Sequence, residues 1–252
     1  MEDMNEVFDN PSVVEVVFEI RFPNLFFIAQ NIGSFQLEIM DKFPKSSQII
    51  EQSVVIGGNK TSVNGENIEN PISSWQFENE TGKTKINIRS NRLNILSQEY
   101  KSYNNPDVDN RFRDLIIGIV PTFLKIVPIK NFSRMGIRYI DHCPLEKLNG
   151  EYFKTFYIPV IDINTYKIED TIENYVSIRT KRDGYYLLFQ CGIKQFEGKY
   201  KYYLDYDGYA NNIEANNFIG VADELQKMIK KEYYLNITEE FKQYMRADTD
   251  ES

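Results

Sequence analysis

Histidine and cysteine are almost absent from this chain of 252 residues, which has one histidine, His142, and two cysteines, Cys143 and Cys191. A zinc site built on histidine is therefore excluded, because neither cysteine completes a ligand set with His142. A Ser-His-Asp triad would have to use His142, and no Gly-X-Ser-X-Gly elbow accompanies it. We expect His142 to be a hydrogen-bonded structural residue and both cysteines to be small buried residues of apolar strands.

Phosphate-binding glycine loops are missing as well, since Gly33 and the pair Gly57-Gly58 lack the partner residues that such loops require. No cofactor is predicted, and the absent constellations favour a protein that is not an enzyme.

Positive charge is in deficit, with 29 Lys and Arg against 37 Asp and Glu and a net charge of −8. Proteins that bind nucleic acid without sequence preference need an excess of basic residues to neutralise phosphates, so we expect no nucleic-acid partner. The acidic balance is typical of a protein kept in solution by its charge.

Long hydrophobic runs are also missing. The longest, Leu115 to Ile129, is interrupted by Pro121, Lys125 and Pro128, so no membrane span is predicted. Residues 1–6 lack the basic start of a signal peptide. We expect a cytoplasmic protein with no membrane contact.

Aromatic residues are plentiful, with 17 Tyr and 17 Phe, which favours strands packed against helices. The period-2 and period-3.6 patterns predict strands at 13–22, 47–56, 75–80, 83–89, 93–100, 132–142, 157–161, 174–182, 185–194 and 199–207. They predict helices at 25–43, 105–126, 145–153, 217–233 and 236–245, with Pro121 kinking or splitting the second. Asn24, Asn217 and Asn236 are the expected helix caps.

This order of elements predicts an α+β fold. We interpret residues 10–130 and 131–246 as two similar halves, each an antiparallel sheet with packed helices, fused into a single domain over 1–252. A segment rich in Asn, Gly and Ser, residues 57–72, has no periodicity and is expected to be a flexible surface loop.

The most informative stretch is Arg134–Asp141. Alternation along a strand places Arg134 and Arg138 on one face, roughly 13 Å apart, with bare backbone at Gly136 between them. Met135, Ile137 and Tyr139 then point to the other face. A face of this kind suits either an anion or a set of carboxylates.

Four motifs occur in order: Asn-Pro-Ser-Val-Val-Glu running into Phe-Glu-Ile-Arg-Phe over 10–22, Trp-Gln-Phe at 75–77, Arg-Met-Gly-Ile-Arg-Tyr-Ile-Asp at 134–141, and Leu-Asp-Tyr-Asp at 204–207. With the closing helices from residue 217, they resemble a sporadically distributed prokaryotic family of uncharacterised proteins of similar length. The resemblance implies an architecture and supplies no catalytic residues. Together with the missing catalytic constellations, it favours a non-catalytic binding or interaction protein, an accessory of a prokaryotic defence or toxin-control module whose partner is another protein.

Two interpretations of the charged strands stay open. Glu15 and Glu19 have the same four-residue spacing as Arg134 and Arg138, so neighbouring strands would form a ladder of cross-strand ion pairs, the interpretation we favour. The alternative is a polar groove for a phosphate-bearing small ligand, and so a phosphoryl-processing enzyme. That groove would be lined by Glu15, Glu19, Arg21, Arg89, Arg134, Arg138 and Arg179. A third idea is an acidic surface that mimics nucleic acid.

Asp205 and Asp207 share a strand face and are weak candidates for a divalent-metal site, with Asp141 or a glutamate as a third ligand. The simpler interpretation is a solvated strand end before Gly208. The aromatic run between residues 185 and 209 alternates, so we expect it to form core rather than a base-stacking platform.

Overall fold

The computed structural model describes residues 6–51, 72–171, 173–196 and 198–247, so the loop predicted at 57–72 lies outside the described residues except at Ile72. The first half contains β1 (Val13–Arg21), α1 (Phe27–Ile39), β2 (Lys45–Glu51), β3 (Ile72–Glu78), β4 (Thr84–Arg89), β5 (Arg92–Ser97) and α2 (Phe112–Ile126). The second half contains β6 (Asn131–Pro144), α3 (Gly150–Phe156), β7 (Val176–Arg182), β8 (Tyr185–Phe196), β9 (Lys199–Glu214), α4 (Phe218–Tyr234) and α5 (Glu239–Arg246).

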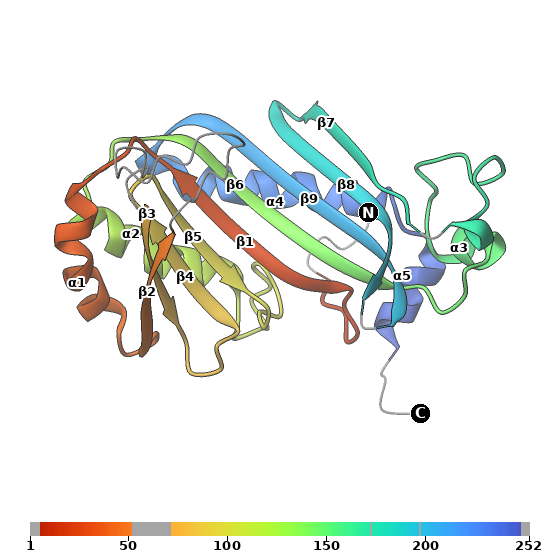
Figure 1. The fold of residues 1–252 in the computed structure, drawn as a ribbon, viewed down its shortest axis with the longest axis horizontal. Coiled ribbons are helices and arrows are strands. Elements are labelled where there is room, and N and C mark those ends of the chain that lie inside the picture. The colour runs from red at the N-terminus through yellow and green to blue at the C-terminus, as the bar shows by residue number, and fades with distance from the viewer. Residues whose placement is uncertain (1–5, 52–71, 172, 197, 248–252) are drawn as a thin grey trace, which may run out of the picture.

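The strands form one nine-stranded sheet in the order β2-β3-β4-β5-β1-β6-β9-β8-β7 (Figure 1). Each neighbouring pair is antiparallel, and the predicted α+β class is confirmed. The first strand of each half, β1 and β6, lies in the middle of the sheet. These two strands pair with each other, so the strands that carry the sequence motifs are direct neighbours.

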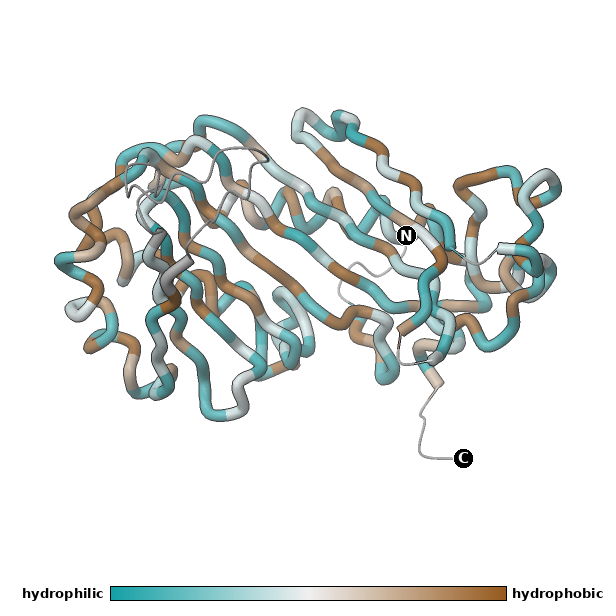
Figure 2. The backbone as a smooth tube through the Cα atoms, in the orientation of Figure 1, coloured by the Kyte–Doolittle hydropathy of each residue, from teal (hydrophilic) through white to brown (hydrophobic). Residues whose placement is uncertain are grey.

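The two faces of the sheet differ in composition, because successive residues of each strand alternate in hydropathy (Figure 2). One face carries buried residues such as Phe18, Ile137 and Leu204, and we name it the covered face. Phe77 of β3 also belongs to it and packs against Phe35 of α1, with ring centroids 5.7 Å apart. The other face carries Glu19 and the residues that align with it across the strands, and we name it the open face.

Helix α4 lies along β6 and β9 on the covered face (Figure 1). Gly208 of β9 permits this close approach, because a Cβ atom there would lie 2.8 Å from the Met228 side chain and 3.0 Å from that of Ile229. A glycine in the middle of a strand therefore has a packing reason here.

Several predicted elements differ from the structure. The strand predicted at 157–161 is absent, since Tyr157 makes only an isolated bridge to Ile237 after α3. Helix α2 continues through Pro121 without splitting, because Val120 and Phe123 are buried in the core on either side. Thr238, not Asn236, caps α5, by accepting a hydrogen bond from the Phe241 backbone N–H.

The expected caps at Asn24 and Asn217 are also not formed as predicted. Helix α1 begins after Phe26, and Asn217 precedes α4 without a side-chain capping bond. Among the described residues, no helix is both long and apolar enough to cross a membrane.

Candidate functional site

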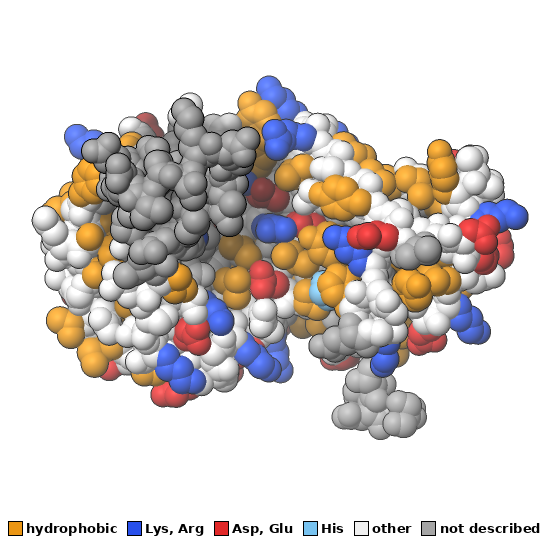
Figure 3. All heavy atoms as spheres, viewed as in Figure 1, with side chains coloured by type: hydrophobic (Ala, Val, Ile, Leu, Met, Phe, Trp, Pro, Cys, Tyr) orange, Lys and Arg blue, Asp and Glu red, His pale blue; other side chains and the backbone are white. Residues whose placement is uncertain are grey.

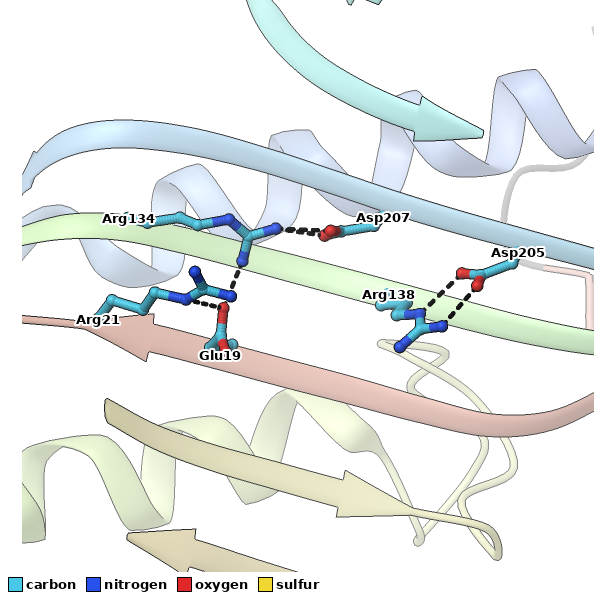
Figure 4. Close-up of polar contacts among 6 residues, drawn as sticks. All are labelled: Glu19, Arg21, Arg134, Arg138, Asp205 and Asp207. Carbon is cyan, nitrogen blue, oxygen red and sulfur yellow. Dashed lines mark hydrogen bonds and ion pairs between the residues drawn. The ribbon is translucent and has the colours of Figure 1, made fainter. Parts of the chain in front are cut away.

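Four of the charged residues predicted to act together lie with Asp205 and Asp207 on the open face of three central strands, β1, β6 and β9 (Figure 4). They are Glu19, Arg21, Arg134 and Arg138. In the antiparallel register, Arg21 pairs with Arg134, Glu19 with Gly136, and Val17 with Arg138. Because Gly136 has no side chain, the space opposite Glu19 is free for the guanidinium group of Arg134. The glycine two residues after Arg134 thus allows the arginine side chain to lie along its own strand, over Gly136.

Arg134 is the centre of the array and contacts two carboxylates. Its Nη1 lies 2.5 Å from Glu19 Oε1, and its Nη2 lies 2.7 and 2.6 Å from the two carboxylate oxygens of Asp207. Glu19 Oε1 also accepts a hydrogen bond of 2.7 Å from Arg21 Nε. The side chains of Arg134, Glu19 and Asp207 are 15%, 13% and 22% exposed, so these charges are largely shielded from water.

Arg138 makes a separate, bidentate ion pair with Asp205 of β9. The Nε–Oδ1 distance is 2.8 Å and the Nη2–Oδ2 distance is 2.6 Å. Tyr203 donates a further hydrogen bond of 2.6 Å to Asp205 Oδ2. Glu15 does not reach Arg138 and accepts a hydrogen bond from Gln98 instead. The predicted ladder is therefore formed by Glu19 and Arg134 but not by Glu15 and Arg138.

The electrostatics follow from burial and from these contacts. Burial raises the pKa of Asp207, and the neighbouring Arg134 only partly opposes this shift. The hydrogen bonds from Arg138 to Asp205 raise the pKa of that guanidinium, which stays charged at any physiological pH. Burial and the bond to Asp205 raise the pKa of the Tyr203 hydroxyl, so it remains a donor.

A row of stacked groups extends from Arg134 towards the edge of the sheet. The Arg134 guanidinium lies 4.5 Å from the ring centroid of Tyr209. Tyr209 stacks on Tyr186 of β8, with centroids 5.1 Å apart and an interplanar angle of 12°. The Lys181 amine of β7 lies 5.1 Å from the centroid of Tyr186. Both tyrosine rings are thus covered on their two faces by neighbours.

The remaining predicted residues are spread along the open face. Arg89 of β4 pairs in register with Arg92, and Arg92 with Arg21, so Arg89 is three strands away from Arg134 along one row. Arg179 of β7 is exposed at the opposite edge, in the row of Arg138. Of the seven candidates, the structure joins Glu19, Arg21 and Arg134 directly.

The geometry does not favour a metal ion at Asp205 and Asp207, the weak metal candidates. Asp205 and Asp207 both share the open face, as predicted, but each carboxylate is already held by an arginine. Asp141, the suggested third ligand, faces the other side of the sheet, where it aligns with Leu204. Within the described part of the chain, no group of three or more His, Cys, Asp and Glu residues has a metal-binding arrangement. The idea of a solvated strand end was wrong for Asp205, which is 1% exposed.

His142 and the cysteines have structural surroundings. The imidazole packs on Phe196, with ring centroids 4.2 Å apart, and its side chain has no hydrogen bond to the described residues. The predicted hydrogen bond is thus replaced by an aromatic contact, and burial lowers the pKa of His142. Cys143 and Cys191 are buried and unpaired, as predicted.

Sequence reasoning missed the surroundings of one buried carboxyl group, Asp141 on the covered face. The signal was present in the alternation, because Met135, Ile137, Tyr139 and Asp141 occupy successive positions of one strand face. An acidic residue at the end of an apolar series predicts a buried carboxyl.

No protein-family model, curated protein or solved structure matches this chain. The function must therefore be inferred from the residues and their geometry.

Proposed function

We propose that this protein is a non-catalytic binding protein that binds an acidic segment of a partner protein. The segment would lie on the open face, over the strands from β6 to the sheet edge at β7. The observation that carries the proposal is that the cations of the central strands on this face are paired with carboxylates, whereas those near the β7 edge are not, among the described residues. We call the first group the inner cations and the second the outer cations. Arg134 and Arg138 are neutralised by carboxylates. Arg179, Lys181 and Lys194, on β7 and β8, have no carboxylate partner within the described ranges.

The outer cations belong to one continuous surface. Arg179 aligns with Leu188 and Lys181 with Tyr186, so both stand on the open face with Asp207 and Tyr209. The Lys194 amine lies 5.0 Å from the ring centroid of Tyr203. Figure 3 shows that this face is hollowed in the middle, where basic and acidic side chains gather. The charge that β7 and β8 offer a partner on this face is therefore positive, although the whole chain carries −8.

The stacked row from Arg134 to Lys181 prepares this surface for binding. Tyrosine and arginine residues contribute most to protein interfaces when their side chains are already fixed, because little conformational entropy is then lost. Tyr186 and Tyr209 are fixed by stacking, and Arg134 by three hydrogen bonds. These side chains thus give the outer cations a support that is already rigid before a partner binds.

The same row favours a protein partner over a nucleic acid. Single-stranded nucleic acids bind by stacking bases on open aromatic faces. Here the Arg134 guanidinium and the Lys181 amine cover the outer faces of the Tyr209 and Tyr186 stack. An acidic peptide segment needs only the exposed cations of β7 and the backbone of this strand, which is the last in the sheet.

The alternative of a phosphate-binding or phosphoryl-processing enzyme needs arginine forks that can accept phosphate oxygens. In this structure the forks of Arg134 and Arg138 already bind Asp207 and Asp205. A phosphate would have to displace two carboxylates, one of them 1% exposed. The geometry therefore favours the binding role.

A matched pair of triple variants tests the proposal. The first carries Arg179→Glu, Lys181→Glu and Lys194→Glu, and the control carries Lys147→Glu, Lys167→Glu and Lys227→Glu at exposed positions outside the open face. Affinity capture from a prokaryotic lysate followed by mass spectrometry should find a protein retained by the wild type and the control but lost by the first variant. Crosslinks from that protein should map to β7 and β8.

Equal retention by both triple variants would refute the role of the open face. Turnover of a nucleotide or polyphosphate by the purified protein, abolished by Glu19→Gln, would support the enzyme instead. A role in a prokaryotic defence or toxin-control module and a cytoplasmic location remain part of the proposal, supported by the sequence resemblance and composition.

The equivalence of the two halves is also proposed. It is supported by the strand order, in which each half places its first strand in the middle and its last strand beside it.

A further inference from the structure

A cavity of about 160 Å³ lies on the covered face, on the opposite side of the sheet from the charged array. It is bounded by β6, β9, α4, the segment 6–13 and the loop 100–105. Its lining extends from buried Asp141 and Tyr206 to exposed Pro11, Lys101 and Asn104, so the cavity reaches the molecular surface. A cavity of about 150 Å³ accommodates a ligand the size of benzene, which sets the scale of a possible ligand.

Asp141 is the buried charged group of this cavity, and its carboxyl group is poorly satisfied. The other charged residues of the lining, Glu6, Lys101 and Lys230, are half-buried or exposed. It is 4% exposed and accepts one hydrogen bond, of 2.8 Å, from Ser12 Oγ to Oδ1. No other hydrogen bond or ion pair reaches it from the residues that the structure describes. Buried carboxylates are normally paired or held by several donors, because an unpaired buried charge is costly. The free oxygen, Oδ2, therefore lacks a donor that a ligand could supply.

A second unsatisfied group lines the same cavity. The Tyr206 hydroxyl is buried and has no hydrogen-bond partner among the described residues. Tyr206 packs on Phe189, with centroids 4.9 Å apart, and edge-on to Tyr233, so its ring is fixed in place. Tyr233 in turn shares a hydrogen bond of 2.7 Å with the Ser12 hydroxyl. Asp141 Oδ2 and the Tyr206 hydroxyl, on adjacent strands, thus lack partners, and the buried Tyr139 hydroxyl of the same wall has none among the described residues either.

Aromatic rings form a large part of the remaining wall. Six tyrosines line the cavity: Tyr100, Tyr103, Tyr139, Tyr206, Tyr233 and Tyr234. Aromatic faces around one carboxylate attract organic cations, through the ring quadrupoles and the opposite charge. An anion would meet the Asp141 carboxylate, and a metal ion would find only two acidic residues in this lining, Asp141 and the less buried Glu6.

We propose that this cavity binds a small organic cation, a primary amine or an amidinium group on an apolar body, with Asp141 as the counter-charge and the Tyr206 hydroxyl as a second polar contact. The ligand's N–H groups donate to Asp141 Oδ2 and to the Tyr206 oxygen, and the tyrosine rings enclose its apolar part. This site is independent of the protein-binding role of the open face, and each can fail without the other.

Benzamidine and benzamide are suitable probes, because they are similar in shape but only benzamidine is a cation at neutral pH. We expect millimolar benzamidine to raise the Tm of the wild-type protein in a concentration-dependent manner, and benzamide to leave it unchanged. In isothermal titration calorimetry, Asp141→Asn should weaken benzamidine binding at least about tenfold, the loss of a charge-assisted hydrogen bond. Tyr206→Phe, which keeps the ring, should weaken it several-fold.

Glu224→Gln is the matched control, since Glu224 is exposed on α4 and does not line the cavity. It should bind benzamidine like the wild type, as should the triple variant of Arg179, Lys181 and Lys194. Three results would overturn the proposal: no response to benzamidine, equal binding of benzamide, or binding that Asp141→Asn and Tyr206→Phe leave unchanged.

Discussion

Asp205 and Asp141 lie on neighbouring strands at nearly the same level of the sheet, since Asp205 aligns with Ile140 and Asp141 with Leu204. Both carboxyl groups are buried, but they face opposite sides. On the open face, Asp205 accepts two hydrogen bonds from Arg138 and one from Tyr203. On the covered face, Asp141 accepts a single hydrogen bond from Ser12.

Asp205 therefore has a structural role, whereas Asp141 can still accept hydrogen bonds from a ligand. A satisfied buried ion pair joins strands and leaves little for a ligand, as Arg138 and Asp205 do for β6 and β9. An unsatisfied carboxyl beside a cavity lowers the stability of the free protein, and natural sequences keep such costs mainly where function needs them. We therefore expect the inner arginines of β6 to hold the strands together, and a small ligand to bind on the covered face, beside Asp141.

Among the substitutions that test this comparison, removal of the central arginine, Arg134, should change the free energy of unfolding most. Arg134→Met leaves the carboxylates of Glu19 and Asp207 close together and without their shared cation. We expect the free energy of unfolding to fall by about 3–5 kcal/mol, the cost of breaking a buried ion pair from one side. Urea denaturation measures this change.

Arg21→Met is the control for Arg134→Met, because Arg21 also contacts Glu19 but its side chain is 48% exposed. Its removal should change the free energy of unfolding by about 0–1 kcal/mol. Equal effects of the two substitutions would show that the array does not hold the strands together.

Asp141→Asn should instead raise the free energy of unfolding at neutral and higher pH. Burial raises the pKa of Asp141 to about 7, against about 3.9 in an unfolded chain. Between these values the native state holds a proton that the unfolded state has lost, so the stability of the wild type falls as pH rises from about 4 to about 7. Asp141→Asn avoids this loss and should be more stable than the wild type at pH 8 by roughly 2–4 kcal/mol.

This gain should shrink towards zero near pH 4, which urea denaturation at several pH values can measure. The groups that face or influence Asp141 are Ser12, Tyr100, Tyr139, Cys143, Tyr206 and Tyr233, with Asp205 acting through the sheet. Burial raises the pKa of the four tyrosines and of Cys143, so none of these titrates between pH 4 and 8. A gain that is the same at every pH would contradict the proposed cause.

Gly136→Ala should have a moderate effect. A Cβ atom at this position would lie 2.9 Å from Arg134 Nη1 and 3.1 Å from the backbone oxygen of Gly208. The guanidinium would have to leave its carboxylates or the strands would have to separate, so we expect a loss of about 1–2 kcal/mol in the free energy of unfolding.

The control for Gly136→Ala is Gly33→Ala in α1, where an added Cβ atom would have no neighbouring atom within 4 Å outside its own helix backbone. Alanine has the higher helix propensity, so this variant should gain about 0.5–1 kcal/mol. A gain in both variants would show that Gly136 is not needed for the position of Arg134.

Much of the fold was predictable because alternation and turn residues are local signals. The alternation of β1 and β6 correctly placed Phe18, Ile20 and Ile137 in the core, but it was wrong for Val14, which is 38% exposed where the register of β1 shifts. The four-residue spacing predicted the pair of Glu19 and Arg134. The partner of Arg138 was not predictable, because it depends on which strand pairs with the far side of β6. Asp205 lies 67 residues away in sequence and meets Arg138 only through the β6–β9 register.

The cavity was beyond sequence reasoning for a related reason. Its wall combines the segment 6–13, the loop 100–105, two strands and α4, and no local pattern relates these parts. The acidic residue at an apolar position was visible, but its lack of donors is a property of the packed structure.

The smallest effect is expected from removing one hydroxyl on each face. Tyr203→Phe deletes a donor to Asp205 at 2.6 Å and should lower the free energy of unfolding by about 1–2 kcal/mol. Tyr206→Phe deletes a buried hydroxyl that has no partner within the described ranges, so we expect a change of less than about 0.5 kcal/mol or a small gain. Urea denaturation of both variants gives the comparison directly. If Tyr206→Phe cost as much as Tyr203→Phe, the Tyr206 hydroxyl would already be satisfied, and the cavity would have one polar contact fewer to offer a ligand.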